Sequence, residues 1–240
     1  MLYLFYLMIL WLFEFGYMLQ HVAVIFQVLN ISKKRSTEGV SLETGYFFIL
    51  GSACRLFWMW DSMLASFYFA YLEILLGVAS LSYLVYIYNL YKANDYIQAE
   101  IQVPEYLKVR FLLVIIVVLS FLFHPGNKNA YYLSLQMFVS LNIFSECIGL
   151  LPQLYLIKNT KETGNLSEYY ILFLTLARFF RLIFWFKMYI DGNNFSSLIL
   201  ADLTHTILLS VFIYTFKKNA NSFAMPTFSE DMNQSRKKIF

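Results

Sequence analysis

The strongest candidates for functional residues in this sequence are ionisable side chains inside long apolar stretches. A charged side chain at the centre of a bilayer costs at least about 2.5 to 3.5 kcal/mol on insertion scales, so each such residue is expected to have a partner or a function. These residue types offer charge pairing, anion binding and proton uptake. The set comprises Glu14, His21, Arg55, Glu73, Glu146, Arg178, Arg181, Asp202 and His205.

Three arginines indicate a site for an anion. Arg178 and Arg181 are three residues apart, which places them on one helical face, where like charges repel. They therefore require a shared anionic partner, for which Glu146 is the nearest candidate. A ligand carboxylate or a lipid phosphate would also serve, because a guanidinium presents a planar fork to such groups. Together with Arg55, the pair would form an anion-binding cavity open to the non-cytoplasmic side, unless each arginine pairs with a helix acid or a lipid headgroup only to fold.

Two histidines add groups that can change charge. His21 lies in the first apolar segment, seven residues after Glu14, and an imidazole there can gain a proton at mildly acidic pH. A structural histidine that shares a hydrogen bond across helices is the alternative. Asp202 and His205 are three residues apart in the last apolar segment, which predicts a mutual pair rather than a proton relay.

The sequence offers no candidate for catalysis or for a cofactor. It contains no GxSxG, HExxH, P-loop or dinucleotide-binding glycine pattern. Cys54 and Cys147 lie far apart in apolar runs and predict neither a metal pair nor a disulfide framework. The net charge of +3 is small and scattered, which excludes a nucleic-acid footprint.

Apolar segments that must position these residues dominate the chain. The composition is 60% hydrophobic and only 14% charged, with a mean hydropathy of +0.59, whereas soluble domains have about 25% charged residues. Most of the segments reach the length of about 17 to 25 residues that one helix needs to cross a bilayer. We therefore expect an all-α integral membrane protein with seven transmembrane helices, at residues 3–30, 44–63, 66–91, 110–124, 130–157, 168–190 and 196–216.

Basic residues predict the orientation in the membrane. Most Lys and Arg residues outside the spans lie in the first, third and fifth loops and in the C-terminal tail, and only Lys128 and Lys187 lie on the opposite side. Because basic loops stay cytoplasmic, the N-terminus should face away from the cytoplasm and the tail toward it. Lys237 and Lys238 in that tail match a dilysine signal for retrieval to the endoplasmic reticulum; a solvated basic end is the alternative.

An internal repeat organises the segments. Gln27 is followed 14 residues later by Ser41, and Gln153 is followed 14 residues later by Ser167. A further 14 residues lead from each serine to Arg55 and Arg181. We therefore predict two parallel three-helix repeats, at 1–91 and 130–216, joined by a connector helix within 92–129 and followed by a polar cytosolic tail at 217–240. Repeats of this kind place a binding site at their interface, near the midplane of the bilayer.

Several of these residues also carry a family resemblance. The stretch Glu146 to Tyr189 resembles the KDEL receptors, which retain proteins of the endoplasmic reticulum lumen, through Leu151-Pro152-Gln153-Leu154, Lys158, Thr160, Tyr170, Leu172, Phe173, Arg178, Leu182 and Trp185. Gly39-Val40-Ser41, Arg55 and His205-Thr206-Ile207-Leu208 are similar to the same family. The resemblance implies the fold of PQ-loop and SWEET transporters, a pair of triple-helix bundles.

The resemblance also implies roles for single residues. Arg55 and Arg178 match arginines that help to hold the retrieval peptide, His21 matches the histidine linked to acid-dependent binding, and Glu146 matches a family acid. Arg181 is assigned to the same ligand site by its place beside Arg178. Glu14 stands where the family has an arginine, so the implied ligand site is partly degenerate.

Three functions are compatible with this sequence. The first is a sorting receptor of the endoplasmic reticulum and Golgi that binds C-terminal peptides of lumenal proteins. The second is a non-catalytic structural or accessory subunit of a larger membrane complex, for example in a mitochondrial membrane. The third and weaker alternative is a transporter of a small solute similar to PQ-loop and SWEET proteins. Membrane lipid is an expected partner of all three, and nucleic acid of none.

Overall fold

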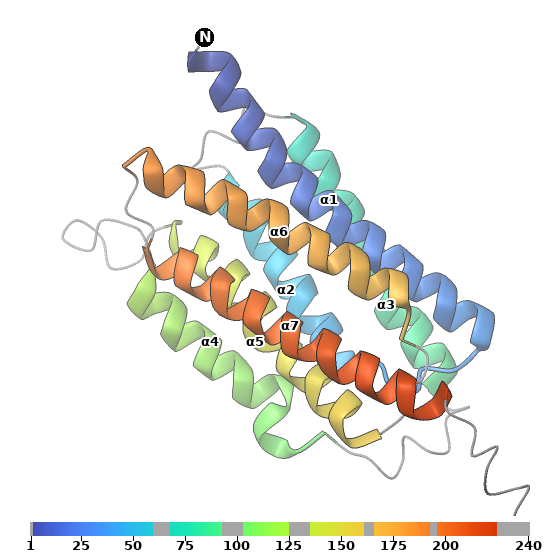
Figure 1. Ribbon diagram of the computed structural model, residues 1–240. Coiled ribbons are helices and arrows are strands. Elements are labelled where there is room, and N and C mark those ends of the chain that lie inside the picture. The colour runs from blue at the N-terminus through green and yellow to red at the C-terminus, as the bar shows by residue number, and fades with distance from the viewer. Residues whose placement is uncertain are drawn as a thin grey trace, which may run out of the picture.

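Helices account for all the regular structure of the described residues. The computed structural model describes residues 2–59, 68–92, 103–124, 135–160, 166–192 and 196–224. These contain α1 (Leu2–Lys34), α2 (Leu42–Met59), α3 (Tyr68–Tyr91), a 3-10 turn η4 (Glu105–Leu107), α4 (Val109–Phe123), α5 (Met137–Thr160), α6 (Glu168–Ile190) and α7 (Ser196–Ala224). The seven α-helices lie side by side in one bundle, from which the N-terminal end of α1 projects (Figure 1).

The predicted segments and the observed helices coincide closely. Each of the seven apolar segments contains most of one α-helix, which confirms the all-α prediction. The first and last helices run further than predicted, to Lys34 and Ala224, because the helix continues into polar residues beyond the apolar stretch. Lysine is a good helix former, so Lys33 and Lys34 are compatible with the last turn of α1.

The bundle has the surface of a membrane protein. Among the described helices, α1, α3, α5 and α7 are long and apolar enough to cross a bilayer, and α4 is a shorter apolar helix. Large apolar side chains are exposed along the outer faces, including Leu75 on α3, Val114 on α4 and Leu200 on α7. Contiguous apolar exposure of this kind is unfavourable in water and suits contact with lipid chains.

The helix contacts follow the same pattern in both triplets. Between the two triplets, α1 packs on α6 and α2 packs on α5; α3 contacts both α1 and α2, and α7 contacts both α5 and α6. Exchanging α1 with α5, α2 with α6 and α3 with α7 reproduces the same set of neighbours. The connector α4 packs mainly on α5, at the outside of the bundle in Figure 1. The residue limits of the repeats stay a prediction, because 93–102 and 125–134 lie outside the described residues.

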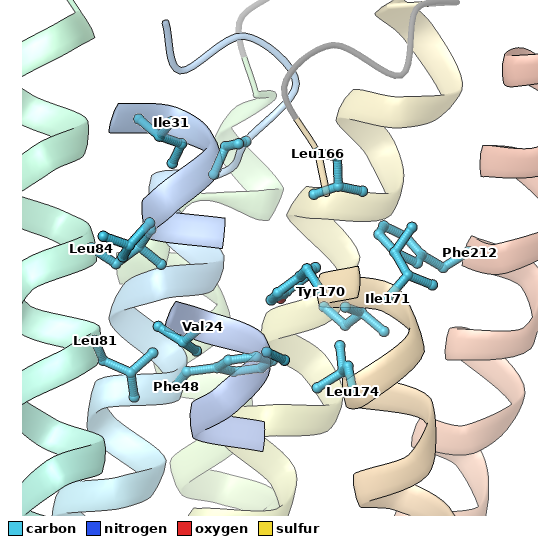
Figure 2. Close-up of a cluster of buried hydrophobic side chains, with 14 of the residues drawn as sticks. Val24, Ile31, Phe48, Leu81, Leu84, Leu166, Tyr170, Ile171, Leu174 and Phe212 are labelled. Carbon is cyan, nitrogen blue, oxygen red and sulfur yellow. The ribbon is translucent and has the colours of Figure 1, made fainter. Parts of the chain in front are cut away.

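Side chains of both repeats share one apolar core. Figure 2 shows Val24, Phe48 and Leu81 of the first repeat gathered with Leu174 and Phe212 of the second. All five are less than a tenth exposed. This cluster lies toward the end of the bundle that is predicted to face the cytoplasm.

A second apolar cluster lies toward the opposite end. It includes Phe13 and Tyr17 of α1 with Phe184 and Trp185 of α6. Along α1, buried polar residues follow Phe13 and precede Val24. The two apolar clusters therefore enclose a layer of buried polar residues.

Gln27 and Gln153, which mark the repeat in the sequence, each form hydrogen bonds with the backbone of the other repeat. The Oε1 atom of Gln27 on α1 accepts a hydrogen bond from the backbone N–H of Ser167, at 3.0 Å, just before α6. The Oε1 atom of Gln153 on α5 accepts one from the backbone N–H of Ser41, at 2.7 Å, just before α2. The Nε2 group of Gln153 also donates to the carbonyl of Gly39. Each repeat thus fixes the start of a helix in the other repeat.

Candidate functional site

A buried charge cluster forms within the first repeat. Arg55 on α2 is 1% exposed, and its Nη2 group lies 2.7 Å from Oε1 of Glu14 on α1. Its Nη1 group lies 2.6 Å from Oε2 of Glu73 on α3. Glu73 also contacts the Nε2 atom of His21 through its other oxygen. We call Glu14, His21, Arg55 and Glu73 the first cluster.

A second buried cluster forms within the second repeat. Arg178 on α6 lies 3.1 Å from Oε2 of Glu146 on α5 and 3.2 Å from Oδ1 of Asp202 on α7. Arg181, one turn further along α6, contacts the same oxygen of Glu146 and lies 3.2 Å from the same oxygen of Asp202. We call Glu146, Arg178, Arg181 and Asp202 the second cluster. The shared anionic partner predicted for the two arginines is therefore present, as a pair of acids.

Residues of α1 join the two clusters. The ring of Tyr17 lies between the repeats, with its centroid 3.6 Å from the guanidinium carbon of Arg55 and 4.5 Å from that of Arg181. Such cation–π contacts stabilise guanidiniums that are removed from water. Gln20 donates to Oε1 of Glu146 at 3.0 Å and accepts from Arg178 at 3.2 Å. Guanidiniums from both repeats therefore meet around one side chain, as the sequence predicts.

The cavity is closed in this structure, which corrects the expectation of an open one. Arg178 and Arg181 are completely buried, and Arg55 is nearly so. Carboxylates of the chain itself occupy the space around the guanidiniums. Phe13 adds an aromatic layer, with its ring centroid 4.4 Å from that of Phe184 and 5.5 Å from the guanidinium carbon of Arg55.

The predicted pair of Asp202 and His205 is wrong. Oδ1 of Asp202 accepts a hydrogen bond from Arg178 and forms an ion pair with Arg181, and contacts between two charged groups are stronger than a bond to a neutral imidazole. Neither ring nitrogen of His205 has a hydrogen-bond partner among the described residues, although the side chain is completely buried. His205 is therefore not the partner of Asp202.

His21 lies at the base of a groove between α1 and α3. The groove has a volume of about 650 Å³, and apolar side chains such as Val22, Leu72 and Leu76 form most of its wall. The imidazole occupies the space beside Gly77, where a Cβ atom would overlap the ring. A small residue at this position of α3 thus allows His21 to reach Glu73.

The arginines retain capacity for a further hydrogen-bond acceptor. Within the described part of the chain, the Nε–H groups of Arg55, Arg178 and Arg181 have no acceptor, although all three are buried. A guanidinium can bind a carboxylate through Nε and one Nη group together. The arrangement can therefore accept an anionic ligand in addition to, or in place of, the internal acids.

Sequence reasoning identified most of these residues and missed some. The structure brings together Arg55, Arg178, Arg181 and Glu146, and it attaches His21 to the same network through Glu73. Tyr17, Gln20 and the pairing role of Asp202 were not predicted. Gln20 had a signal, because it precedes Glu146 by 126 residues, which is also the offset between Gln27 and Gln153. The predicted signal at Lys237 and Lys238 lies outside the described residues.

Comparisons with known proteins give one consistent result. The sequence profile of the family described as "ER lumen protein retaining receptor" matches residues 36–188. Human ER lumen protein-retaining receptor 2 is 28% identical over 200 residues, covering 82% of this chain and 89% of the human protein. Mouse ER lumen protein-retaining receptor 3 is 26% identical over 197 residues, covering 81% and 86%. The ER lumen protein-retaining receptor of Kluyveromyces lactis is 24% identical over 202 residues, covering 82% and 88%.

Proposed function

Because the chain belongs to the ER lumen protein retaining receptor family, we propose that it binds C-terminal peptides of lumenal proteins and returns them to the endoplasmic reticulum. The ligand site consists of Arg55, Arg178 and Arg181, with Glu146 and His21 as supporting groups. The peptide carboxylate and its acidic side chains are the groups that these guanidiniums hold. This is a sorting function and requires no catalytic residue.

One observation carries the proposal. The guanidiniums of Arg55 and Arg181 come from different repeats and face the same ring of Tyr17. Their Nε–H groups have no acceptor among the described residues. An anion placed between the repeats would therefore contact charges from both, which supports binding at the repeat interface.

Peptide binding by the purified full-length chain tests this function. A fluorescent peptide that ends in Asp-Glu-Leu with a free carboxylate is titrated with the protein in lipid nanodiscs, and its anisotropy is measured. We expect saturable binding that falls at least about tenfold in Arg178→Gln, since a buried charge contact is lost. Arg110→Gln is the matched control, because Arg110 is exposed at the start of α4. The same peptide with an amidated C-terminus should bind more weakly than the acid.

Absence of saturable binding to the wild-type chain at both mildly acidic and neutral pH would refute the proposal. Equal affinity of the free acid and the amide would show that the terminal carboxylate is not held by the arginines.

The C-terminal lysines provide a separate test of location. We propose that Lys237 and Lys238 retrieve the chain itself to the endoplasmic reticulum. Replacement of both lysines by serine in a fluorescently tagged chain should move its steady-state signal from the endoplasmic reticulum to later secretory compartments. An unchanged distribution would show that the pair is only a solvated basic end. A mitochondrial signal for the wild type would contradict the receptor function.

Every arginine of the two clusters is paired with an acid of the same chain, and this pairing also favours a second candidate function. An interior in which every guanidinium already has acid partners from the same chain suits a structural subunit of a membrane complex, because such a subunit needs no free arginine. The human, mouse and yeast relatives above carry receptor names, which favours the first function. Gentle solubilisation followed by size-exclusion chromatography separates the two, since a structural subunit should elute with partner proteins.

A further inference from the structure

Within each cluster, one acid makes fewer contacts than the other. Glu14 contacts Arg55 through Oε1, and its Oε2 atom has no hydrogen-bond partner among the described residues. Asp202 uses Oδ1 for both arginines of α6, and its Oδ2 atom has no hydrogen-bond partner in the same part of the chain. Glu73, in contrast, also contacts His21, and Glu146 also accepts a hydrogen bond from Gln20.

The same two acids occupy the arginine groups that would hold a ligand. Oε1 of Glu14 lies 2.7 Å from Nη2 of Arg55, and Oδ1 of Asp202 lies 3.2 Å from Nη2 of Arg181. Both acids are completely buried. They therefore bind the guanidiniums in a dry environment, where water does not weaken the contact.

We propose that Glu14 and Asp202 are tethered competitors, whose carboxylates hold Arg55 and Arg181 until an acidic ligand takes their place. This inference rests on the proposed peptide-binding function and states which residues of the chain control the affinity for the peptide. The ligand is a peptide with a free terminal carboxylate and acidic side chains. Its carboxylates replace those of Glu14 and Asp202 one for one, so no guanidinium becomes unpaired during the exchange.

Charge balance explains why the competitors would set the affinity. The two clusters contain three guanidiniums and four carboxylates, so the empty site has no surplus positive charge to attract an anion. Removing the charge of either competitor shifts the site toward the positive sign that favours an acidic ligand. Arg55 keeps Glu73 and Arg181 keeps Glu146 after such a change. The variants therefore avoid the large loss of stability that follows when a buried charge has no partner.

Neutral variants of the two acids test the inference. The fluorescent Asp-Glu-Leu peptide is titrated with the full-length chain in nanodiscs, as wild type, Glu14→Gln and Asp202→Asn, and thermal unfolding shows which variants are folded. We expect at least about tenfold tighter binding for each neutral variant, since one competing charge is absent. Asp202→Glu keeps the charge and should bind the peptide more weakly than Asp202→Asn does. Glu105→Gln is the control for loss of an exposed acid, at 75% side-chain exposure.

The two acids lie in different repeats, so either folded variant decides the question independently of the other. Binding to the wild type together with no tighter binding to a folded neutral variant would overturn this inference and leave the receptor function in place. If neither the wild type nor the folded neutral variants bind the peptide, both this inference and the receptor function are overturned. If Asp202→Glu binds the peptide as tightly as Asp202→Asn does, and both bind it more tightly than the wild type, the effect comes from the shape of the side chain and not from its charge. That result would also overturn the inference.

Discussion

The two buried clusters occupy corresponding places in the repeats and differ in their charge balance. The first cluster surrounds one guanidinium, that of Arg55, with the carboxylates of Glu14 and Glu73. The second cluster binds two guanidiniums with two carboxylates. The first cluster therefore has one carboxylate more than it has guanidiniums, whereas the two numbers are equal in the second cluster.

A duplicated scaffold thus holds two different arrangements of buried charge. The second cluster joins α5, α6 and α7 through equal numbers of guanidiniums and carboxylates. In the first cluster a single guanidinium joins α1, α2 and α3, and His21 is a further partner of Glu73.

Loss of the arginine from each cluster should give the largest difference. We expect Arg55→Gln to lower the free energy of unfolding by about 3 to 5 kcal/mol, because it leaves two buried carboxylates without a guanidinium. Arg181→Gln should have a smaller effect, since Arg178 still contacts both Glu146 and Asp202. Thermal and denaturant unfolding in a mild detergent would measure both. Equal losses would show that the two clusters do not differ in charge balance.

Removal of a complete pair from the second cluster should be less damaging than removal of one member. The double variant Arg181→Gln with Asp202→Asn keeps one guanidinium and one carboxylate, Arg178 and Glu146, at 3.1 Å. We expect it to be about 1 to 3 kcal/mol more stable than the sum of the two single changes predicts. A double-mutant cycle of unfolding free energies measures this coupling. Simple additivity would mean that the pair does not act as a unit.

The contact between the His21 ring and Gly77 gives a further test by unfolding free energy. Gly77→Ala places a methyl group where the imidazole lies, and overpacking of this kind typically costs about 1 to 3 kcal/mol. The same substitution should be tolerated in a His21→Ala background, which frees the space. Gly45→Ala is a matched control on α2, because its added Cβ would meet only the side chain of Val85, at an ordinary 3.6 Å. A full loss of stability from Gly77→Ala in both backgrounds would contradict the arrangement of His21 and Glu73.

The symmetric glutamines test whether the two repeats are equivalent. Gln27→Ala and Gln153→Ala each remove a side-chain acceptor from a buried backbone N–H, that of Ser167 or Ser41. Each should lower the unfolding free energy by about 1 to 3 kcal/mol, the usual penalty for an unsatisfied buried donor. Unfolding of the two variants side by side provides the measurement. An effect confined to one of them would indicate that the repeats are not equivalent at this position.

The sequence predicts the helices and the repeat well because both depend on local pattern. Apolar stretches long enough to cross a membrane mark the helices, and the shared spacing after Gln27 and Gln153 marks the duplication. The same spacing does not reveal that each glutamine binds the other repeat, because an offset shows equivalence and carries no information about which copies touch. Contacts across the repeat interface require the packing of α1 on α6 and of α2 on α5.

The buried clusters were predictable only in part, because spacing along one helix does not reveal which side chains of other helices compete for the same partner. Arg178 and Arg181 predict a shared acid because they lie on one helical face, and the structure contains it. The pair of Asp202 and His205 satisfies the same spacing rule and does not form, because two guanidiniums from α6 compete for the carboxylate. Tyr17 has no charge and no repeat partner that marks it, so its place between the arginines follows only from the three-dimensional arrangement.

A double-mutant cycle on peptide affinity tests whether arginines of both repeats bind one ligand. Arg55→Lys and Arg181→Lys keep the charge and remove the guanidinium fork, so binding of the Asp-Glu-Leu peptide stays measurable in each variant. We expect the two changes to be coupled by more than about 0.5 kcal/mol in binding free energy. Strictly additive effects, or affinities unchanged by either substitution, would contradict a single site shared by the two repeats.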